Sequence, residues 1–267
     1  MYAAAGLVTS RTAGRCLRQA RELGLTIPKA VTDAEAFAAE VEQVATAPAP
    51  VRPSPPALPG ELASLVADHV DAVRAHAQSR HVAATYRSDA EGALIDAVRA
   101  AAEGWITAMV TMYADHLAAF EKASPRLPQD ATAERLDRLT PTQFKHWQTA
   151  DRAAFKLDAI VHARRDFDRM LNQPAGRFGD LAAAATVTAI PEGVRCREVW
   201  QWVSYGAKQW RSATLDRVTR WRALSEAAVR ADLTLSLAER GRLHHRAMGY
   251  QTWLDTMLTP NLRNVLT

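Results

Sequence analysis

Two histidines and two carboxylates have the residue types and spacing closest to acid–base or metal chemistry. Asp158, His162 and Asp166 recur every four residues in a stretch expected to be helical, so their side chains step along one side of that helix. His116 lies in another expected helix and could complete the group. Two imidazoles and a carboxylate can bind a metal ion or act as acid and base. An interhelical layer of ion pairs needs the same residue types, and we favour that interpretation.

The sequence lacks the signatures of the common nucleotide-binding, hydrolase and metalloenzyme classes. It contains no G-x-x-x-x-G-K-[ST], G-x-G-x-x-G or G-x-S-x-G. H-E-x-x-H and the E-x-x-H pair of di-iron bundles are also absent. Cys16 and Cys196 are far apart and too few for a thiolate zinc site. We therefore expect no cofactor and no metal, and an enzyme or metalloprotein is the least favoured class.

Basic residues form two groups that could contact an acidic partner or a nucleic acid. Arg11, Arg15, Arg18 and Arg21 fall roughly on one face of an expected N-terminal helix. The second group lies on an expected long helix from Arg197 to Arg230, on the side opposite its apolar face. Its members are Arg197, Lys208, Arg211 and Arg222. If either group binds a nucleic acid, the affinity should fall steeply as salt rises.

Charge is distributed unevenly along the 267 residues. Residues 60–124 contain 5 basic and 9 acidic side chains, whereas residues 193–267 contain 12 basic and 6 acidic ones. Opposite charges on one chain favour contacts between copies or with another protein. Arginine supplies 28 of the 33 basic residues, which is typical of a GC-rich genome, either bacterial or that of a phage.

The compartment follows from what the sequence lacks. The longest apolar runs are about ten residues, and a bilayer-spanning helix needs ~20, so we expect no membrane contact. Met1–Ser10 has no charged segment ahead of its apolar stretch, which argues against a secretory signal. Two distant cysteines fit a reducing environment. The expected location is the cytoplasm or the inside of a phage particle.

The periodicity predicts an all-α fold, a multi-helix bundle with long helices. Apolar and ring-bearing side chains at helical spacing predict a central helix over Ser88–Phe120, with Ser88 and Glu91 as its capping box. A separate helix over Glu61–Ala84 precedes it across a kink or turn. The apolar residues expected to point inward from that first helix are Leu62, Val66, Val70, Val73 and Ala77. Thr140, Pro141 and Gln143 predict another helix start.

Three regions are expected along the chain. Residues 1–47 form a helical hairpin, residues 48–60 a Pro-rich linker, and residues 61–267 the bundle. Ala20 and Gly24 have the spacing of a helix-turn-helix motif, but Pro28 falls where its second helix would form, so an ordinary hairpin is favoured. Ser236 and Glu239 predict the start of a last helix. Residues 172–193 fit a short helix or a buried loop equally well, and no strand pattern is found.

Tryptophan positions bear on whether aromatic rings are free to stack on bases. The helical wheel puts four tryptophans in the core and two at the surface, and leaves Trp202 undecided. The core four are Trp105, Trp147, Trp210 and Trp221, and the surface two are Trp200 and Trp253.

From the absent catalytic signatures, the long helices and the separated charge, we expect a non-enzymatic assembly or scaffold protein that works through protein–protein contacts, such as a structural protein of a phage or mobile element. A nucleic-acid-binding accessory protein is the first alternative.

Overall fold

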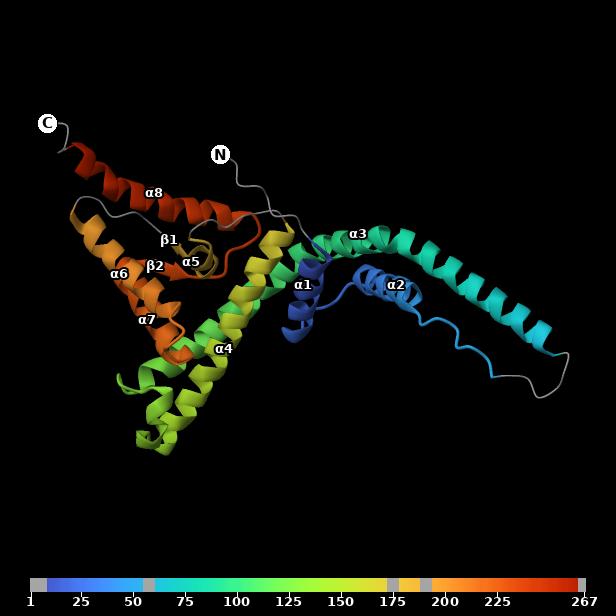
Figure 1. Cartoon of the computed structure of the whole chain (residues 1–267). Coiled ribbons are helices and arrows are strands. Elements are labelled where there is room, and N and C mark those ends of the chain that lie inside the picture. Colours follow the sequence, from blue (N-terminus) through green and yellow to red (C-terminus); the bar gives the residue numbers. More distant parts are fainter. Residues whose placement is uncertain (1–8, 55–60, 172–177, 188–193, 264–267) are drawn as a thin grey trace.

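The structure is a computed structural model that describes residues 9–54, 61–171, 178–187 and 194–263. Its fold is all-α, as predicted, with a single two-stranded sheet among the described residues (Figure 1). The helices are α1 (Ser10–Glu22), α2 (Lys29–Thr46), α3 (Leu62–Ala123), α4 (Pro141–Met170), α5 (Gly179–Ala184), α6 (Val194–Trp210), α7 (Arg217–Ala231) and α8 (Arg242–Arg263). Two 3-10 turns, η1 (Ser124–Arg126) and η2 (Ala133–Arg138), join α3 to α4.

Helix α3 is one bowed element of 62 residues (Figure 1). The predicted helix start at Ser88 is wrong, because α3 runs through residues 85–91 without a break. No proline or glycine interrupts residues 62–91, and alanine, the strongest helix former, recurs throughout them. The amides that Ser88 would have capped therefore bond within the helix.

The second half of α3 packs against α4 and forms the centre of the core. Trp105, Met109 and Tyr113 are buried there, as their spacing predicts. Helix α4 begins with the predicted capping box, in which the Gln143 amide donates to the Thr140 side chain and the Gln143 side chain accepts from the Thr140 amide. Helices α1 and α2 pack on α3 of this antiparallel pair, and helices α1, α5 and α7 pack on α4.

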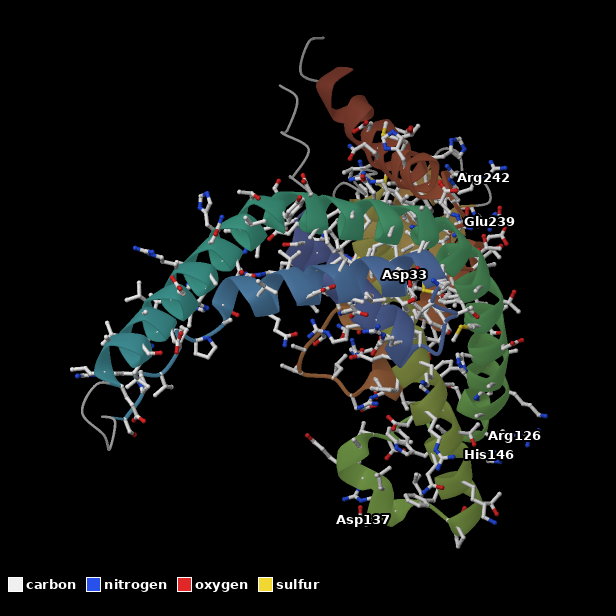
Figure 2. The ribbon with its side chains drawn as sticks, turned by 90° about the vertical axis from the view of Figure 1, so that its right-hand side faces the viewer. Asp33, Arg126, Asp137, His146, Glu239 and Arg242 are labelled. Atoms are coloured by element: carbon white, nitrogen blue, oxygen red, sulfur yellow. The ribbon has the colours of Figure 1, made fainter. Side chains whose placement is uncertain are left out.

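The two N-terminal helices, α1 and α2, both pack on α3. Thr9 caps α1, and Gly24, with φ at +72°, adopts the left-handed conformation that ends it. The indole Nε1 of Trp105 donates to the Thr26 carbonyl at 2.8 Å and fixes the turn between α1 and α2. Helix α2 then lies along the first half of α3 (Figure 2). The division of the chain into domains stays a prediction.

The predicted long helix from Arg197 to Arg230 is wrong, because it is a hairpin of α6 and α7. Asp216 caps α7, accepting from the Thr219 amide at 3.0 Å and the Thr219 hydroxyl at 2.8 Å. Gly206 lets the two helices approach closely, since a Cβ there would lie 2.3 Å from Cβ of Ala227. Folding back halves the helix and moves Arg222 away from the other basic residues.

A small antiparallel sheet also departs from the prediction. Strands β1 (Ala185–Val187) and β2 (Leu233–Leu235) pair with Thr186 opposite Thr234. The backbone continues to pair beyond β2, where the Ser236 and Ala238 amides donate to carbonyls of α5. The predicted helix start at Ser236 is therefore wrong, and α8 begins only at Arg242. Of residues 172–193, only 178–187 are described, and they contain α5 and β1.

The tryptophans follow the predicted burial at the four core positions but not at the two surface positions. The four expected in the core are buried, Trp200 is half-buried, and Trp202 is 43% exposed. Trp253 was expected at the surface, and this is wrong: it is 0% exposed, and its Nε1 donates to the Cys196 carbonyl at 3.3 Å. The reason is α8, which packs on α5 and α6. Among the described residues, no helix is long and apolar enough to span a bilayer.

Candidate functional site: an apolar arm

The candidate acid–base group does not assemble. Asp158 accepts from the Arg220 guanidinium at 2.5 Å and from the indole Nε1 of Trp221 at 2.9 Å. Asp166 forms an ion pair with Arg15 at 3.1 Å, and it accepts hydrogen bonds from Gln19 at 3.0 Å and from Arg169 at 2.7 Å. In the described ranges, no three histidine, cysteine or carboxylate side chains lie together as metal ligands would. These carboxylates serve as ion-pair partners.

His116 stands apart from that layer. Partial burial lowers the pKa of its imidazole, and the positive charge of Lys156 lowers it further. His162 is exposed on α4. Asp115 opposes this lowering of the His116 pKa, and neither histidine belongs to a group of metal-ligand side chains among the described residues.

A paired polar layer runs along α4 instead, as its charged residues predict. Asp151 pairs with Arg217 at 3.3 Å, and Arg165 pairs with Asp180 at 2.8 Å. The deepest pair is Arg164 with Asp168, both fully buried. The pKa of the Asp168 carboxyl is raised to about 6, because burial raises it by more than Arg164 lowers it.

The N-terminal basic group is partly used within the chain. Arg15 pairs with Asp166, and Arg21 makes a two-pronged pair with Glu35 of α2. Arg11 and Arg18 are exposed. These pairs tie α1 to α4 and to α2, so only part of the group is open to a partner.

The second basic group is split by the α6–α7 turn. Arg197, Lys208 and Arg211 are exposed, but Arg222 is half-buried. The Arg222 guanidinium donates to the side chain and carbonyl of Ser124 and to the carbonyls of Leu127 and Pro128, at 2.9–3.1 Å. The expected outward position of Arg222 is therefore wrong, because this side chain holds the loop after α3.

Exposed apolar side chains gather on what we call the arm, which is α2 together with residues 62–90 of α3. The arm projects from the body formed by the rest of the chain (Figure 1). Leu62 is 59% exposed, Val66 52%, Val70 39% and Val73 40%. We call these residues, with the exposed Ala77, the stripe. They were expected to point inward, and this is wrong, because α2 covers a neighbouring face of α3.

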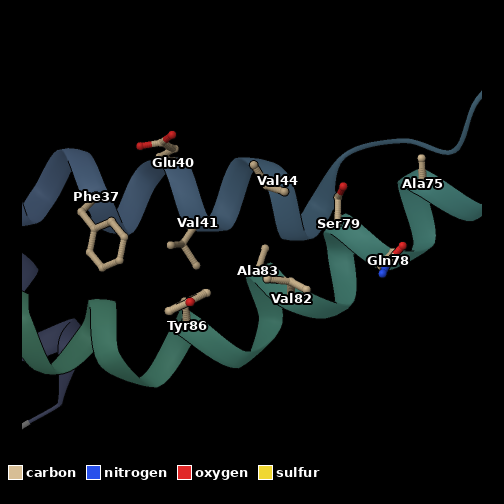
Figure 3. Close-up of a pocket in the computed structure, with 10 residues that line it drawn as sticks. All are labelled: Phe37, Glu40, Val41, Val44, Ala75, Gln78, Ser79, Val82, Ala83 and Tyr86. Carbon is tan, nitrogen blue, oxygen red and sulfur yellow. The ribbon is translucent and has the colours of Figure 1, made fainter. Parts of the chain in front are cut away.

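A groove opens along one side of the seam between α2 and α3, with a volume of about 560 Å³. Figure 3 shows Phe37 and Val41 of α2 pointing toward Tyr86 of α3, with Val44 and Val82 further along. Apart from Val41, these side chains are exposed. The groove has one charged lining residue, Glu40, which forms no ion pair among the described residues. Most of its lining side chains are apolar.

The other side of the same seam is closed by polar contacts. Arg87 pairs with Glu42 at 2.8 Å, and the Arg80 Nε donates to the Ala45 carbonyl at 2.9 Å. The two sides of the seam therefore differ: an ion pair and a hydrogen bond close one, and apolar side chains line the open one. Helical periodicity could have identified the apolar residues of the arm, but not which of them would lack a partner within the chain.

A second hollow, of about 1250 Å³, lies between the end of α3 and the α6–α7 hairpin. Trp202 and Tyr205 are exposed at its edge, and the Arg230 guanidinium lies 3.9 Å from the Trp202 ring centroid. Arg222 lies in its wall, fully engaged by the loop carbonyls. The exposed Trp202 ring therefore already has a cation–π partner within the chain, the Arg230 guanidinium.

Comparison with protein-family models, with curated proteins and with solved structures gave no match. The arm and its geometry therefore carry the functional argument.

Proposed function

We propose that this protein is a non-enzymatic assembly or scaffold protein whose arm makes protein–protein contacts. The observation that carries the proposal is the stripe, four large apolar side chains at helical spacing that are exposed on a projecting helix. Contiguous apolar patches on a soluble protein typically mark interaction sites. A helix face of this spacing suits packing against another helix. A structural role in a phage or mobile element is the narrower form of this proposal.

The hydrogen bonds made by the candidate acid–base residues support a non-enzymatic role. The carboxylates nearest to an acid–base arrangement already accept hydrogen bonds from arginines or an indole. Apolar contact surface, in contrast, is present on two sides of the arm.

A nucleic-acid partner is the less favoured function. Arg11, Arg18, Arg197, Lys208 and Arg211 are exposed and could contact phosphates. Arg222, Arg15 and Arg21 are occupied within the chain, so fewer cations remain than the sequence suggested. Binding through those that remain should show a correspondingly shallow dependence on salt.

Site-specific photocrosslinking in the producing cell tests the assembly function. A benzoylphenylalanine at Val70, on the stripe, should form adducts with protein, identified by peptide mass spectrometry. The same probe at Thr107, exposed on the body part of α3, is the matched control. Val73→Asp should abolish the adducts at Val70. If Val70 gives no protein adduct, or gives the same adducts as Thr107, the arm is not a protein contact surface.

A further inference from the structure

We infer that the arm binds a second copy of this chain, with the stripe of one copy seated in the groove of the next. The inference rests on the proposed assembly function and names the partner of the same surface.

The first argument is that the stripe and the groove lie on opposite sides of α3. Val66, Val73 and Ala77 of the stripe each precede a groove residue by nine positions, and those groove residues are Ala75, Val82 and Tyr86. At about 100° per residue, nine positions correspond to half a turn of the helix wheel. A copy that receives a neighbour in its groove therefore keeps its own stripe free.

The second argument is length. At 1.5 Å per residue, the valines of the stripe, from Val66 to Val73, span about 10 Å, and the α3 wall of the groove, from Ala75 to Tyr86, spans about 16 Å. The valines are therefore short enough to lie within the groove, whose apolar walls are Phe37 and Val44 on one helix and Val82 and Tyr86 on the other.

The third argument is charge. Glu40 is exposed in the groove and pairs with no described cation. Arg74 flanks the stripe, its side chain is 78% exposed, and among the described residues it forms one ion pair, a long contact of 3.9 Å with Asp71. Residues 62–90 contain three acidic and three basic side chains, so two arms do not repel each other. Arg74 of one copy and Glu40 of the next thus carry the opposite charges that an ion pair across this contact needs.

A contact between two different surfaces is heterologous, so each copy can bind two neighbours. Repetition then produces a closed ring or an open array. A contact between two stripes would instead be symmetric and would stop at a dimer.

A mixing experiment separates these alternatives. The stripe variant carries Val66→Asp and Val73→Asp, and the groove variant carries Val44→Asp and Val82→Asp. All four valines are 38–52% exposed, so the variants should fold, which circular dichroism checks. Analytical ultracentrifugation over a range of concentrations should show wild type assembling beyond a dimer. Each variant alone should self-associate at least about 100-fold more weakly.

The mixture gives the sharper result. Each variant keeps the surface that the other has lost, so an equimolar mixture should form a one-to-one dimer and nothing larger. Val229→Asp, at a valine 84% exposed on α7, is the matched control and should assemble like wild type. Glu40→Arg and Arg74→Glu should each weaken assembly, and the two combined in one chain should restore it.

The outcomes distinguish the inference from the function on which it rests. If wild type assembles but the mixture stays monomeric, the stripe does not seat in the groove, and the assembly function survives. If wild type is monomeric at every concentration, the second copy is not the partner. The crosslinking at Val70 then decides separately whether the arm contacts another protein.

Discussion

Replacing Arg222 with methionine should destabilise the fold, and the structure allows the size of the effect to be worked out. Methionine keeps an apolar stem but removes a guanidinium that donates four hydrogen bonds to the loop after α3. Hydrogen bonds from a charged donor contribute about 1.5–3 kcal/mol each when buried. Arg222 is only half-buried and the four bonds are not additive, so we expect Arg222→Met to lower the free energy of unfolding by about 3 kcal/mol.

Part of that effect is electrostatic. The guanidinium lies at the C-terminus of α3, where the unpaired carbonyls carry partial negative charge. Burial lowers the pKa of the Arg222 guanidinium, although nearby carboxylates oppose the shift. Burying the positive charge therefore costs desolvation free energy, which the hydrogen bonds to the carbonyls must offset. Arg222→Lys keeps the charge but cannot span four acceptors, and its stability should fall between wild type and Arg222→Met.

Urea unfolding followed by circular dichroism measures both variants, and a thermal melt provides a second reading. For a chain of this size, about 3 kcal/mol corresponds to a drop in Tm of about 6–12 °C. Lys208→Met is the matched control, because Lys208 is exposed, and it should stay within about 0.5 kcal/mol of wild type. Equal stabilities for Arg222→Met and Lys208→Met would refute the structural role of Arg222 and return it to the exposed basic group.

Two further predictions concern side chains in the body. Trp253→Ala should lower the free energy of unfolding by about 3–5 kcal/mol in urea, because the ring is fully buried, whereas Trp202→Ala should cost about 1 kcal/mol or less, and similar losses would contradict the burial described. Burial raises the pKa of the Asp168 carboxyl above its unfolded value, so its contribution to the free energy of unfolding should decrease by on the order of 3 kcal/mol as pH rises from about 4 to about 6. Asp168→Asn should lack this decrease, and parallel pH profiles for the variant and wild type would show that Asp168 is ionised throughout.

Helix caps and helical periodicity in the sequence correctly predicted the elements that depend on local contacts. The capping box at Thr140 and Gln143 correctly predicted the start of α4. The core face of α3 also followed from its spacing, because several apolar positions repeat over many turns. These elements depend on contacts within a few residues, and such contacts can be found without knowing the fold.

Tertiary contacts decided the elements that the sequence misjudged. Ser236 and Glu239 have the spacing of a capping box, but the backbone there pairs with α5 and prolongs the strand pairing. The α6–α7 turn had a local signal that was missed, since Asp216 precedes Thr219 by the spacing of a cap. Helical period alone continues through such a turn, and the wheel then assigns Arg222 to the wrong surface.

The stripe illustrates a different gap between sequence and structure. Its spacing indicated an apolar helix face, and the expectation that this chain would cover that face was wrong. Periodicity reports that a face is apolar, but the identity of its partner depends on the arrangement of all other elements. For this reason the sequence placed the expected partner contacts on the two basic groups and not on the arm.

Several arginines of the body donate hydrogen bonds to backbone carbonyls, which bears on whether the basic composition indicates a polyanion partner. Arg164 donates to the carbonyls of Ala238 and Glu239, and Arg246 donates to that of Ser236. Arg222 does the same for the loop after α3. In each case the guanidinium satisfies carbonyls that have left a helix or a strand, and its planar fork of five donors suits several acceptors at once. These three guanidinium groups thus hold irregular backbone in place, while the stripe on the arm is apolar and exposed. A partner that recognises shape and apolar area, as a second arm would, fits this division better than a polyanion.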